Sequence, residues 1–270
     1  MTNDESAVRR LVRDRYADAA SEGCCGGTET SCCGGDDGTS DTASDAAEIA
    51  REIGYDDEAI ETVDGEANLG LGCGNPTAIA DLEPGETVLD LGSGGGFDCF
   101  LAAREVGPEG RVIGVDMTPE MIEKARANAR ANDAGNVSFR LGEIEHLPVA
   151  DGVVDTIISN CVVNLSPAKD RVFEEAYRVL RPGGRLAITD PVRTDSLPES
   201  VREDPGSLAG CISGAESPER IASLLEAAGF IDIRVELDPD SREVIDEWHD
   251  EYDLGGSLLS ARIEAEKPVE

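Results

Sequence analysis

Lysine is scarce in this chain of 270 residues. It occurs only at positions 124, 169 and 267, and Lys and Arg together number 23 against 57 Asp and Glu, for a formal net charge of −34. Basic side chains drive binding to phosphate backbones and to anionic membranes, so this balance excludes both as partners. The acid is spread along the whole chain. That favours a halophilic protein, in which high salt screens self-repulsion, over an acidic mesophilic one.

Long apolar runs are missing as well. No segment has about 18 consecutive apolar residues, so no transmembrane helix is expected. Charges throughout residues 1–20 leave no apolar stretch for a signal peptide, and we therefore expect a cytoplasmic protein. Aromatic residues make up only 4% of the chain, but hydrophobic residues make up 40%. That is enough for an aliphatic core in one α/β domain with modest extensions, or in two small domains.

Histidine occurs only at His146 and His249, and neither lies in an obvious catalytic loop. In contrast, the chain has eight cysteines. In a cytoplasmic protein, cysteines are more typical of ligands, nucleophiles or redox-active thiols than of structural disulfides.

From residue 87 onward, short apolar segments alternate with amphipathic ones. Strands that alternate with helices indicate a parallel sheet with right-handed crossovers and helices on both faces. The expected strands are 88–91, 111–115, 137–141, 153–159, 185–189 and 231–237, with an antiparallel edge strand at 257–265. The expected helices are 5–20, 44–53, 97–106, 118–132, 166–180 and 217–228. The segment 21–45, rich in Gly, Ser, Thr, Asp and Cys, is predicted to be a flexible linker.

A Gly-rich loop, DLGSGGG at 90–96, follows the first of these strands and precedes a helix. Its glycines let the backbone turn sharply and approach a ligand. The dinucleotide pattern G-x-G-x-x-G fails because Phe97 stands at its sixth position, and no Walker A sequence is present. Asp116 ends the next strand, where a carboxylate can bind ribose hydroxyls. Glu143 follows the third strand, where an acid can accept a hydrogen bond from an adenine amine.

Each of these features alone has a simpler explanation, such as a tight turn at the glycines or a helix start at Asp116. Together, and in this order, they indicate a nucleoside site without a pyrophosphate site. S-Adenosylmethionine fits such a site, because an acidic pocket accommodates its cationic sulfonium. The pattern therefore favours the class I methyltransferase fold.

Three cysteines lie in loops that the fold can bring together. Cys161 follows the fourth strand, and ligands bind beyond the carboxyl ends of parallel strands. Cys73 and Cys211 lie in Gly-rich loops, where side chains can converge on a site. Cys99 instead lies on a helix among apolar residues and is predicted to pack in the core.

Thiolates are soft ligands that suit a three-coordinate, thiophilic centre such as As(III). Arsenic bound to three sulfurs keeps a lone pair, which can attack a sulfonium methyl in line. No proton is removed, so this chemistry needs no general base and agrees with the shortage of histidine. Catalysis then consists mainly of positioning. Structural zinc sites favour C-x₂₋₄-C pairs, and the three loop cysteines lack that spacing.

Two further pairs, Cys24-Cys25 and Cys32-Cys33, lie in the predicted linker. Adjacent cysteines are poorly spaced for zinc. These pairs either capture metalloid and pass it inward, or supply reducing equivalents between methylation rounds, or are incidental thiols.

The residues from about 65 to 215 resemble the arsenite S-adenosylmethionine methyltransferases. The resemblance rests on ANLGLGCGNP at 67–76, the loop and helix at 90–100, GVDMTPEM at 114–121, FRLGEIE at 139–145 and IISNCVVNLSP at 157–167, and it extends to the Cys211 loop and to 260–263. The segments around Cys73 and Cys161 are specific to this family, whereas the Gly-rich loop is common to class I methyltransferases.

The resemblance implies a seven-stranded, mostly parallel Rossmann-like sheet. It divides the chain into an N-terminal helix and linker (1–47), a cofactor-binding domain (48–190) and a C-terminal arsenic-binding region with closing strands (191–270). It also implies that Cys161 and Cys211 hold arsenic through every methylation. Cys73 is then the third ligand for inorganic arsenite and can form a transient disulfide.

The same resemblance implies the cofactor site, the substrates and a partner. S-Adenosylmethionine is expected to be bound by Asp90, Gly92, Ser93, Gly94, Asp116, Met117, Glu143, Ile144 and Asn160. The expected substrates are arsenite and methylarsenite, and a thiol reductant of the thioredoxin or glutathione type is the expected partner.

Two other functions remain open at this point. A carbon methyltransferase acting on a quinone or sterol-like acceptor would have a segment similar to residues 142–148. It needs a large apolar pocket and a base, and it leaves the three loop cysteines unexplained. A non-catalytic metalloid-binding protein explains the cysteines but leaves the cofactor loop without a role.

Overall fold

The computed structural model describes residues 5–21, 39–63, 66–203, 207, 211–246, 248 and 254–270. Its strands are β1 (Thr87–Leu91), β2 (Arg111–Asp116), β3 (Val137–Leu141), β4 (Val154–Asn160), β5 (Leu180–Arg193), β6 (Ile231–Asp238) and β7 (Leu258–Glu266). Its helices are α1 (Glu5–Ser21), α2 (Thr39–Glu52), α3 (Asp57–Thr62), α4 (Thr77–Ala80), α5 (Phe97–Val106), α6 (Pro119–Ala131), α7 (Lys169–Val179), α8 (Glu199–Glu203), α10 (Pro218–Ala228) and α11 (Arg242–Asp246), with 3₁₀ turns η1 (Val163–Leu165) and η2 (Pro239–Ser241).

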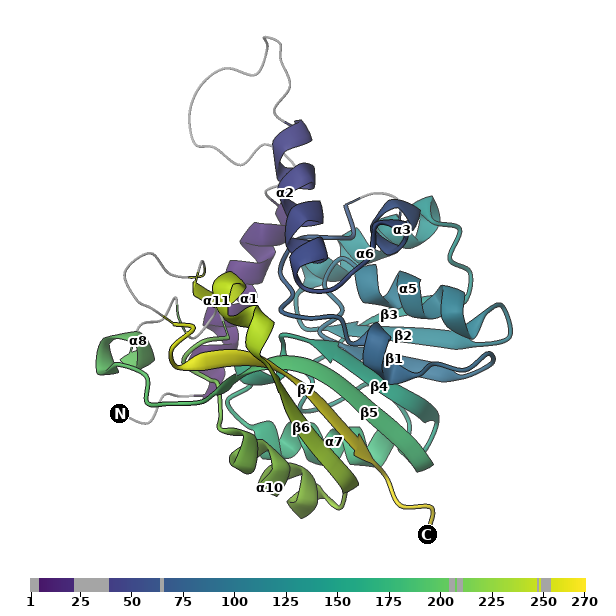
Figure 1. Ribbon diagram of the computed structural model, residues 1–270. Helices are drawn as coiled ribbons and strands as arrows, with labels where there is room; N and C mark the ends of the chain where they lie inside the picture. Colours follow the sequence, from purple (N-terminus) through teal and green to yellow (C-terminus); the bar gives the residue numbers. More distant parts are fainter. Residues whose placement is uncertain are drawn as a thin grey trace.

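The seven strands form one sheet in the order β3-β2-β1-β4-β5-β7-β6 (Figure 1). Strands β1 to β5 run parallel, and β7 runs antiparallel to both β5 and β6. The predicted seven-stranded, mostly parallel fold is confirmed. The strand order reverses between β1 and β4, and in such sheets ligands bind beyond the carboxyl ends of the strands at that point.

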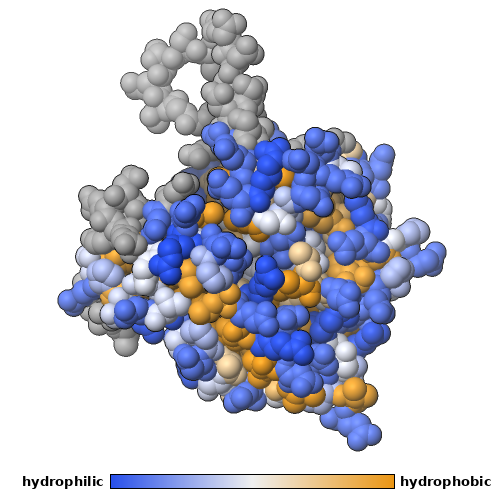
Figure 2. Space-filling model, in the orientation of Figure 1, coloured by the Kyte–Doolittle hydropathy of each residue, from blue (hydrophilic) through white to orange (hydrophobic). Residues whose placement is uncertain are grey.

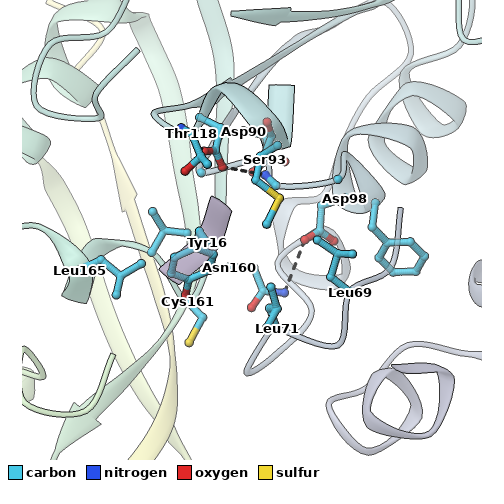
Figure 3. Close-up of a pocket in the computed structure, with 18 of the residues that line it drawn as sticks. Tyr16, Leu69, Leu71, Asp90, Ser93, Asp98, Thr118, Asn160, Cys161 and Leu165 are labelled. Atoms are coloured by element: carbon cyan, nitrogen blue, oxygen red, sulfur yellow. Dashed lines mark hydrogen bonds between the residues drawn. The ribbon is translucent and has the colours of Figure 1, made fainter. Parts of the chain in front are cut away.

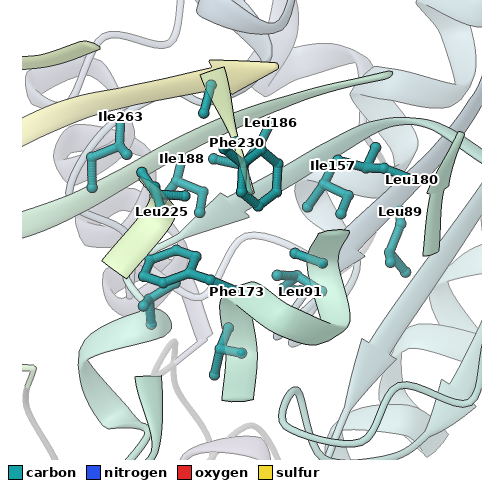
Figure 4. Packing of buried hydrophobic residues seen from close by; sticks show 14 of the residues in the cluster. Leu89, Leu91, Ile157, Phe173, Leu180, Leu186, Ile188, Leu225, Phe230 and Ile263 are labelled. Atoms are coloured by element: carbon teal, nitrogen blue, oxygen red, sulfur yellow. The ribbon is translucent and has the colours of Figure 1, made fainter. Parts of the chain in front are cut away.

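Alternate residues of each strand fill two separate cores, one on each face of the sheet. Leu89 and Ile157 belong to the core under α7 and α10, whereas their neighbours Val88 and Ile158 belong to the core under α5 and α6. Figure 1 shows these helix pairs on opposite sides of the sheet, and Figure 4 shows the first core, with Phe173 of α7 facing the strands. Because successive side chains of a strand point to opposite faces of the sheet, this alternation fixes which side chains face each core.

The ends of three elements differ from the prediction. Helix α2 begins at Thr39 rather than at 44, so the last part of the predicted linker at 21–45 is helical. Helix α7 begins at Lys169 rather than at 166, because the Ser166 hydroxyl accepts a hydrogen bond from the backbone N–H of Ala168 and donates one to the buried Glu145. Strand β5 runs from Leu180 to Arg193 rather than over 185–189, with a local irregularity in its pairing with β4 before Arg185. Helices α3, α4, α8 and α11 span six residues or fewer, too short to show a helical period in the sequence.

Strands β6 and β7 of the C-terminal region belong to the same sheet as β1 to β5, while the domain boundaries at 47 and 190 remain a prediction. Hydrophilic residues cover most of the face seen in Figure 2, with smaller apolar areas between them. None of the helices in the described part of the chain has both the length and the apolar character to cross a membrane. The four cysteines of the linker and His249 lie outside the described residues.

Candidate active site

A cavity that is open to solvent lies at the carboxyl ends of β1, β2 and β4. It is lined by the Gly-rich loop, by the loop at 67–72, by the segment after β4, and by α1, which lies across it. Figure 3 shows Asp90 and Ser93 on one side of this cavity and Tyr16, Asn160 and Cys161 on another. The cavity therefore lies at the point where the strand order reverses, as expected for this kind of sheet.

The Gly-rich loop is shaped to hold a ligand. Gly94 has a φ of +49°, a Cβ there would meet no atom within 4 Å, and its backbone N–H donates to Asp116 at 3.0 Å. A Cβ at Gly92 would lie 2.4 Å from the Val162 side chain, so only glycine fits. The buried Ser93 hydroxyl has no hydrogen-bond partner among the described residues. The exposed loop backbone and the unsatisfied hydroxyl fit the amino-acid end of S-adenosylmethionine.

Three carboxyl groups line the same cavity: Asp90 is buried, and Asp98 and Asp116 are partly buried. Burial raises the pKa of Asp98 to about 6, and burial together with the charge of Asp98 raises the pKa of Asp90 well above its ordinary value. Burial also raises the pKa of Asp116, although backbone N–H groups of Thr118 and Gly94 partly offset the effect. Such groups cost stability without a cation nearby, so the cavity is suited to a positively charged ligand.

The three loop cysteines come together beside this cavity. Cys73, Cys161 and Cys211 form one buried cluster with Val12 and Leu165. Interactions with the Cys211 and Cys73 thiols, together with burial, raise the pKa of the Cys161 thiol well above its ordinary value. The Cys211 thiol also donates to the carbonyl oxygen of Cys161 at 2.8 Å. Positions 73, 161 and 211 thus meet at one point.

Two of these cysteines have strained backbones. Cys161 has a φ of +58° and Cys211 a φ of +63°, in the left-handed region that costs a residue with a side chain about 1 kcal/mol or more. Among the described residues, Asp81, Asp133 and Asp232 also have a positive φ, but aspartate tolerates this conformation. Both strained residues belong to the buried cluster that contains Cys73.

The loop that carries Cys73 is held by the end of β4. The side-chain oxygen of Asn160 accepts from the backbone N–H of Cys73 at 3.0 Å, and its Nδ2 donates to the carbonyl of Gly74 at 2.7 Å. Glycines on either side of Cys73 make this close approach possible. A Cβ on Gly72 would lie 2.7 Å from Asn160, and one on Gly74 would lie 2.8 Å from Thr189.

Helix α1 closes the cavity from the other side. Its residues Arg9, Val12 and Tyr16 line the cavity, and Arg9 forms an ion pair with the buried Glu145 at 3.2 Å. Burial raises the pKa of the Tyr16 phenol well above its ordinary value, and the neighbouring Cys211 and Cys161 thiols add to the effect. Tyr16 therefore lies between the cofactor cavity and the thiol cluster.

Most of the predicted site residues lie where the sequence placed them. The cavity is lined by Asp90, Gly92, Ser93, Gly94, Asp116, Met117, Ile144, Asn160 and Cys161. Cys73 and Cys211 lie behind Cys161 and do not line it. Glu143, whose half-exposed side chain pairs with Arg9 at 3.6 Å, does not line it either, whereas the buried Glu145, which pairs with the same Arg9, does. Cys99 packs in the core under α5 and donates to Asp90 at 3.2 Å.

Sequence reasoning missed four functional candidates. In the sequence, Tyr16 stands out only by its helical spacing. That spacing does not reveal that the helix packs against the cavity. Asp98 interrupts an otherwise apolar helix start, a signal that points to a buried carboxyl group. Asp190 directly follows an apolar strand, the same signal that identified Asp116. Glu145 lines the cavity, although Glu143 was the acid predicted to bind the cofactor.

The fold and this cavity define a class I S-adenosylmethionine-dependent methyltransferase. A family model described as a methyltransferase domain matches residues 82–229. The arsenite methyltransferase of Halobacterium salinarum is 55% identical over 98% of this chain and 68% of its own length. The human arsenite methyltransferase is 38% identical over 64% of this chain, which spans 48% of that protein. The chain belongs to the arsenite methyltransferase family.

A solved structure agrees with this assignment. The crystal structure of an arsenic(III) S-adenosylmethionine methyltransferase from Chlamydomonas reinhardtii matches with a TM-score of 0.60 and 36% identity, over 83% of this chain and 74% of that one. The chain is shorter than its relatives, since it spans about two thirds of the archaeal protein and about half of the human one.

Proposed function

We propose that this chain transfers methyl groups from S-adenosylmethionine to trivalent arsenic bound by Cys73, Cys161 and Cys211. One observation carries the proposal: three thiols from separate loops form one cluster next to a cavity lined by buried and partly buried carboxyl groups. The thiols hold a soft, three-coordinate substrate, and the carboxyl groups favour a cationic methyl donor.

Sulfur ligation leaves arsenic with its lone pair. When bound, S-adenosylmethionine supplies an electrophilic methyl group. The lone pair would take up this methyl group in line, and the electron pair of the broken sulfur–carbon bond would remain on sulfur. No proton moves, so the protein contributes mainly position and exclusion of water, for which Tyr16 and α1 close the cavity.

The substrate needs rearrangement of the thiols before it is held by all three. Cys161 contacts both neighbours, and within the described part of the chain no group of three His, Cys, Asp or Glu side chains is arranged as a metal-ion site. We infer that the outer thiols rotate around arsenic as it binds. Asn160 keeps the backbone of the Cys73 loop in place meanwhile.

Each methyl transfer raises the formal oxidation state of arsenic by two. A return to the trivalent state therefore requires two electrons, which we assign to a thiol reductant of the thioredoxin or glutathione type. The pairs Cys24-Cys25 and Cys32-Cys33 are proposed to pass arsenite or electrons to the site. Glu143 does not line the cavity, so we propose that it contributes to cofactor binding indirectly, through its ion pair with Arg9.

One assay separates this proposal from the alternatives. Protein purified in high salt is incubated with arsenite, S-adenosylmethionine and a thiol reductant, and arsenic species are separated by chromatography with elemental mass detection. We expect methylated arsenic. Binding of arsenite without methylation would identify a sequestering protein, and the absence of any arsenic interaction would favour a carbon methyltransferase.

A further inference from the structure

Asp190 lies where β5 meets the thiol cluster. Its side chain is 2% exposed, and its Oδ2 accepts from the backbone N–H groups of Val162 and Val163 at 3.1 and 2.8 Å. These two residues directly follow Cys161. The preceding carbonyl, that of Thr189, accepts from the backbone N–H of Cys161 at 2.8 Å and from the Cys73 thiol at 3.7 Å. The end of β5 therefore organises two of the three cysteines.

The second oxygen of the Asp190 carboxyl group is buried, and it has no hydrogen-bond partner among the described residues. Burial of an unsatisfied carboxylate oxygen is costly. Lys169 lies close enough for its charge to act on Asp190, but its Nζ donates to the carbonyl oxygens of Asn164 and Ser166, at 3.3 and 3.0 Å. The fold thus places a carboxyl group at the cluster at a net cost to stability.

The charge of Asp190 acts on the Cys73 thiol. Burial is the main cause of the raised pKa of Cys73, and the negative charge of Asp190 raises it further. A carboxylate therefore disfavours thiolates in the empty site. That effect opposes arsenic capture, so it does not explain why an acid stands at this position.

The charge balance of the reaction does explain it. The substrate, trivalent arsenic on three thiolates, is neutral, while the sulfonium of the methyl donor carries one positive charge. As the arsenic–carbon bond forms and the sulfur–carbon bond breaks, the positive charge leaves sulfur and arrives on arsenic. Burial raises the pKa of Asp190 to about 7, and a positive charge that arrives on arsenic favours the carboxylate form. A carboxylate close to Cys73 stabilises this charge more strongly on arsenic than on the more distant sulfonium, and preorganised charge of that kind lowers a barrier.

We propose that Asp190 is a positioning residue with an electrostatic role: it holds the Cys161 turn and stabilises the positive charge that develops on arsenic. This inference rests on the proposed function. It assigns to Asp190 a part in the transfer step and none in the affinity for arsenite.

The test compares Asp190→Asn with Asp155→Asn. The amide keeps the size of the side chain and an oxygen for the Val162 and Val163 N–H groups, but it removes the charge. Asp155 is also buried, accepts from the backbone N–H of Thr87 at 2.6 Å and lies near the opposite end of β4. Arsenite affinity is measured by equilibrium dialysis, and the transfer rate by single turnover with saturating S-adenosylmethionine and preloaded arsenite.

We expect Asp190→Asn to bind arsenite within about threefold of the wild type and to transfer methyl on the order of 10²-fold more slowly, as for the loss of one preorganised charge or donor. Asp155→Asn should match the wild-type rate. A parallel loss of arsenite affinity and rate in Asp190→Asn would overturn the electrostatic role, because the residue would then act only by holding the turn. An unchanged rate would overturn the proposal as well.

Asp190→Glu covers the case in which Asp190→Asn does not fold. It restores the negative charge at a small displacement, so its transfer rate should exceed that of a charge-free variant, Asn or Ser, by at least tenfold. A rate no higher than theirs would count against the proposal. Wild-type protein that binds arsenite but forms no methylated product would instead refute the proposed function itself, before the variants are compared.

Discussion

The side-chain oxygen of Asn160 accepts a hydrogen bond from the backbone N–H of Cys73 at 3.0 Å, across 87 positions of sequence. Asn160 is the last residue of β4 and directly precedes Cys161. One amide group therefore joins the loop of one substrate cysteine to the strand end that carries the next. Because Asn160 also lines the cofactor cavity, it connects the two binding sites.

The glycine before Cys73 provides the first test of this connection. In Gly72→Ala the new Cβ would lie 2.7 Å from Asn160 Nδ2, so the amide or the loop must shift and its hydrogen bonds weaken. We expect the dissociation constant for arsenite to rise at least about tenfold, equivalent to about 1.4 kcal/mol. Equilibrium dialysis measures it. Gly135→Ala is the control, since a Cβ there meets no atom within 4 Å, and equal affinities of the two variants would contradict the expectation.

The thiols provide the second test. Cys161→Ser and Cys211→Ser should each abolish all methylation, because a hydroxyl is a hard, weakly acidic ligand that does not replace a thiolate on arsenic. Cys99→Ser should leave methylation largely intact, since Cys99 packs in the core away from the cluster and serine keeps a donor for Asp90. Product formation is followed with arsenite as substrate. Methylation that survives in Cys161→Ser would refute the site.

The carboxyl groups of the cavity predict how cofactor binding depends on pH. Asp98, with its pKa raised to about 6 by burial, is ionised above pH 6 and protonated below it. Affinity for the cationic S-adenosylmethionine should therefore fall by up to about tenfold between pH 6 and pH 5. The neutral thioether S-adenosylhomocysteine should change less. Calorimetric titration measures both, and equal pH dependence for the two ligands would argue against a role for this charge.

The same pKa shift predicts the opposite effect on stability. The folded-state pKa of Asp98 lies above the ordinary 3.8, so the folded state binds the proton more tightly and stability falls as pH rises from about 4 to about 6. Above pH 6 the full destabilisation of the folded state by the ionised Asp98 remains. Asp98→Asn should therefore be more stable than the wild type at pH 8 by about 1–3 kcal/mol and should bind S-adenosylmethionine more weakly. Chemical denaturation without ligand measures this, and a less stable variant would contradict it.

The acidity of the chain predicts a strong dependence on salt. A formal net charge of −34 destabilises the compact state by self-repulsion, and salt screens it. Raising KCl from about 0.1 M to about 2 M should increase Tm by about 5–15 °C, equivalent to a few kcal/mol for a chain of this size. Sucrose at equal osmolality serves as control, since it does not screen charge. A Tm that responds equally to both would refute the halophilic interpretation.

Much of the site was predictable because it follows the ends of strands. Asp116 and Cys161 could be found because an apolar run stops at each of them, and parallel strands end at one edge of the sheet. The same rule points to Asp190, where it was not applied. Strand ends fix the edge of the sheet but not the direction of each side chain. The buried Glu145 lines the cavity and the half-exposed Glu143 does not, although both pair with Arg9.

The sequence by itself determined the fold, the cofactor loop and the identity of the three cysteines, because these depend on local periodicity, glycine and residue type. Only the tertiary structure decided that Tyr16 of α1 lies over the cavity, that Asn160 holds Cys73, and that Asp190 stands unsatisfied at the thiols. Each of these is a contact between residues far apart in the chain. Such contacts arise from how helices and loops pack on the sheet, which no local pattern records.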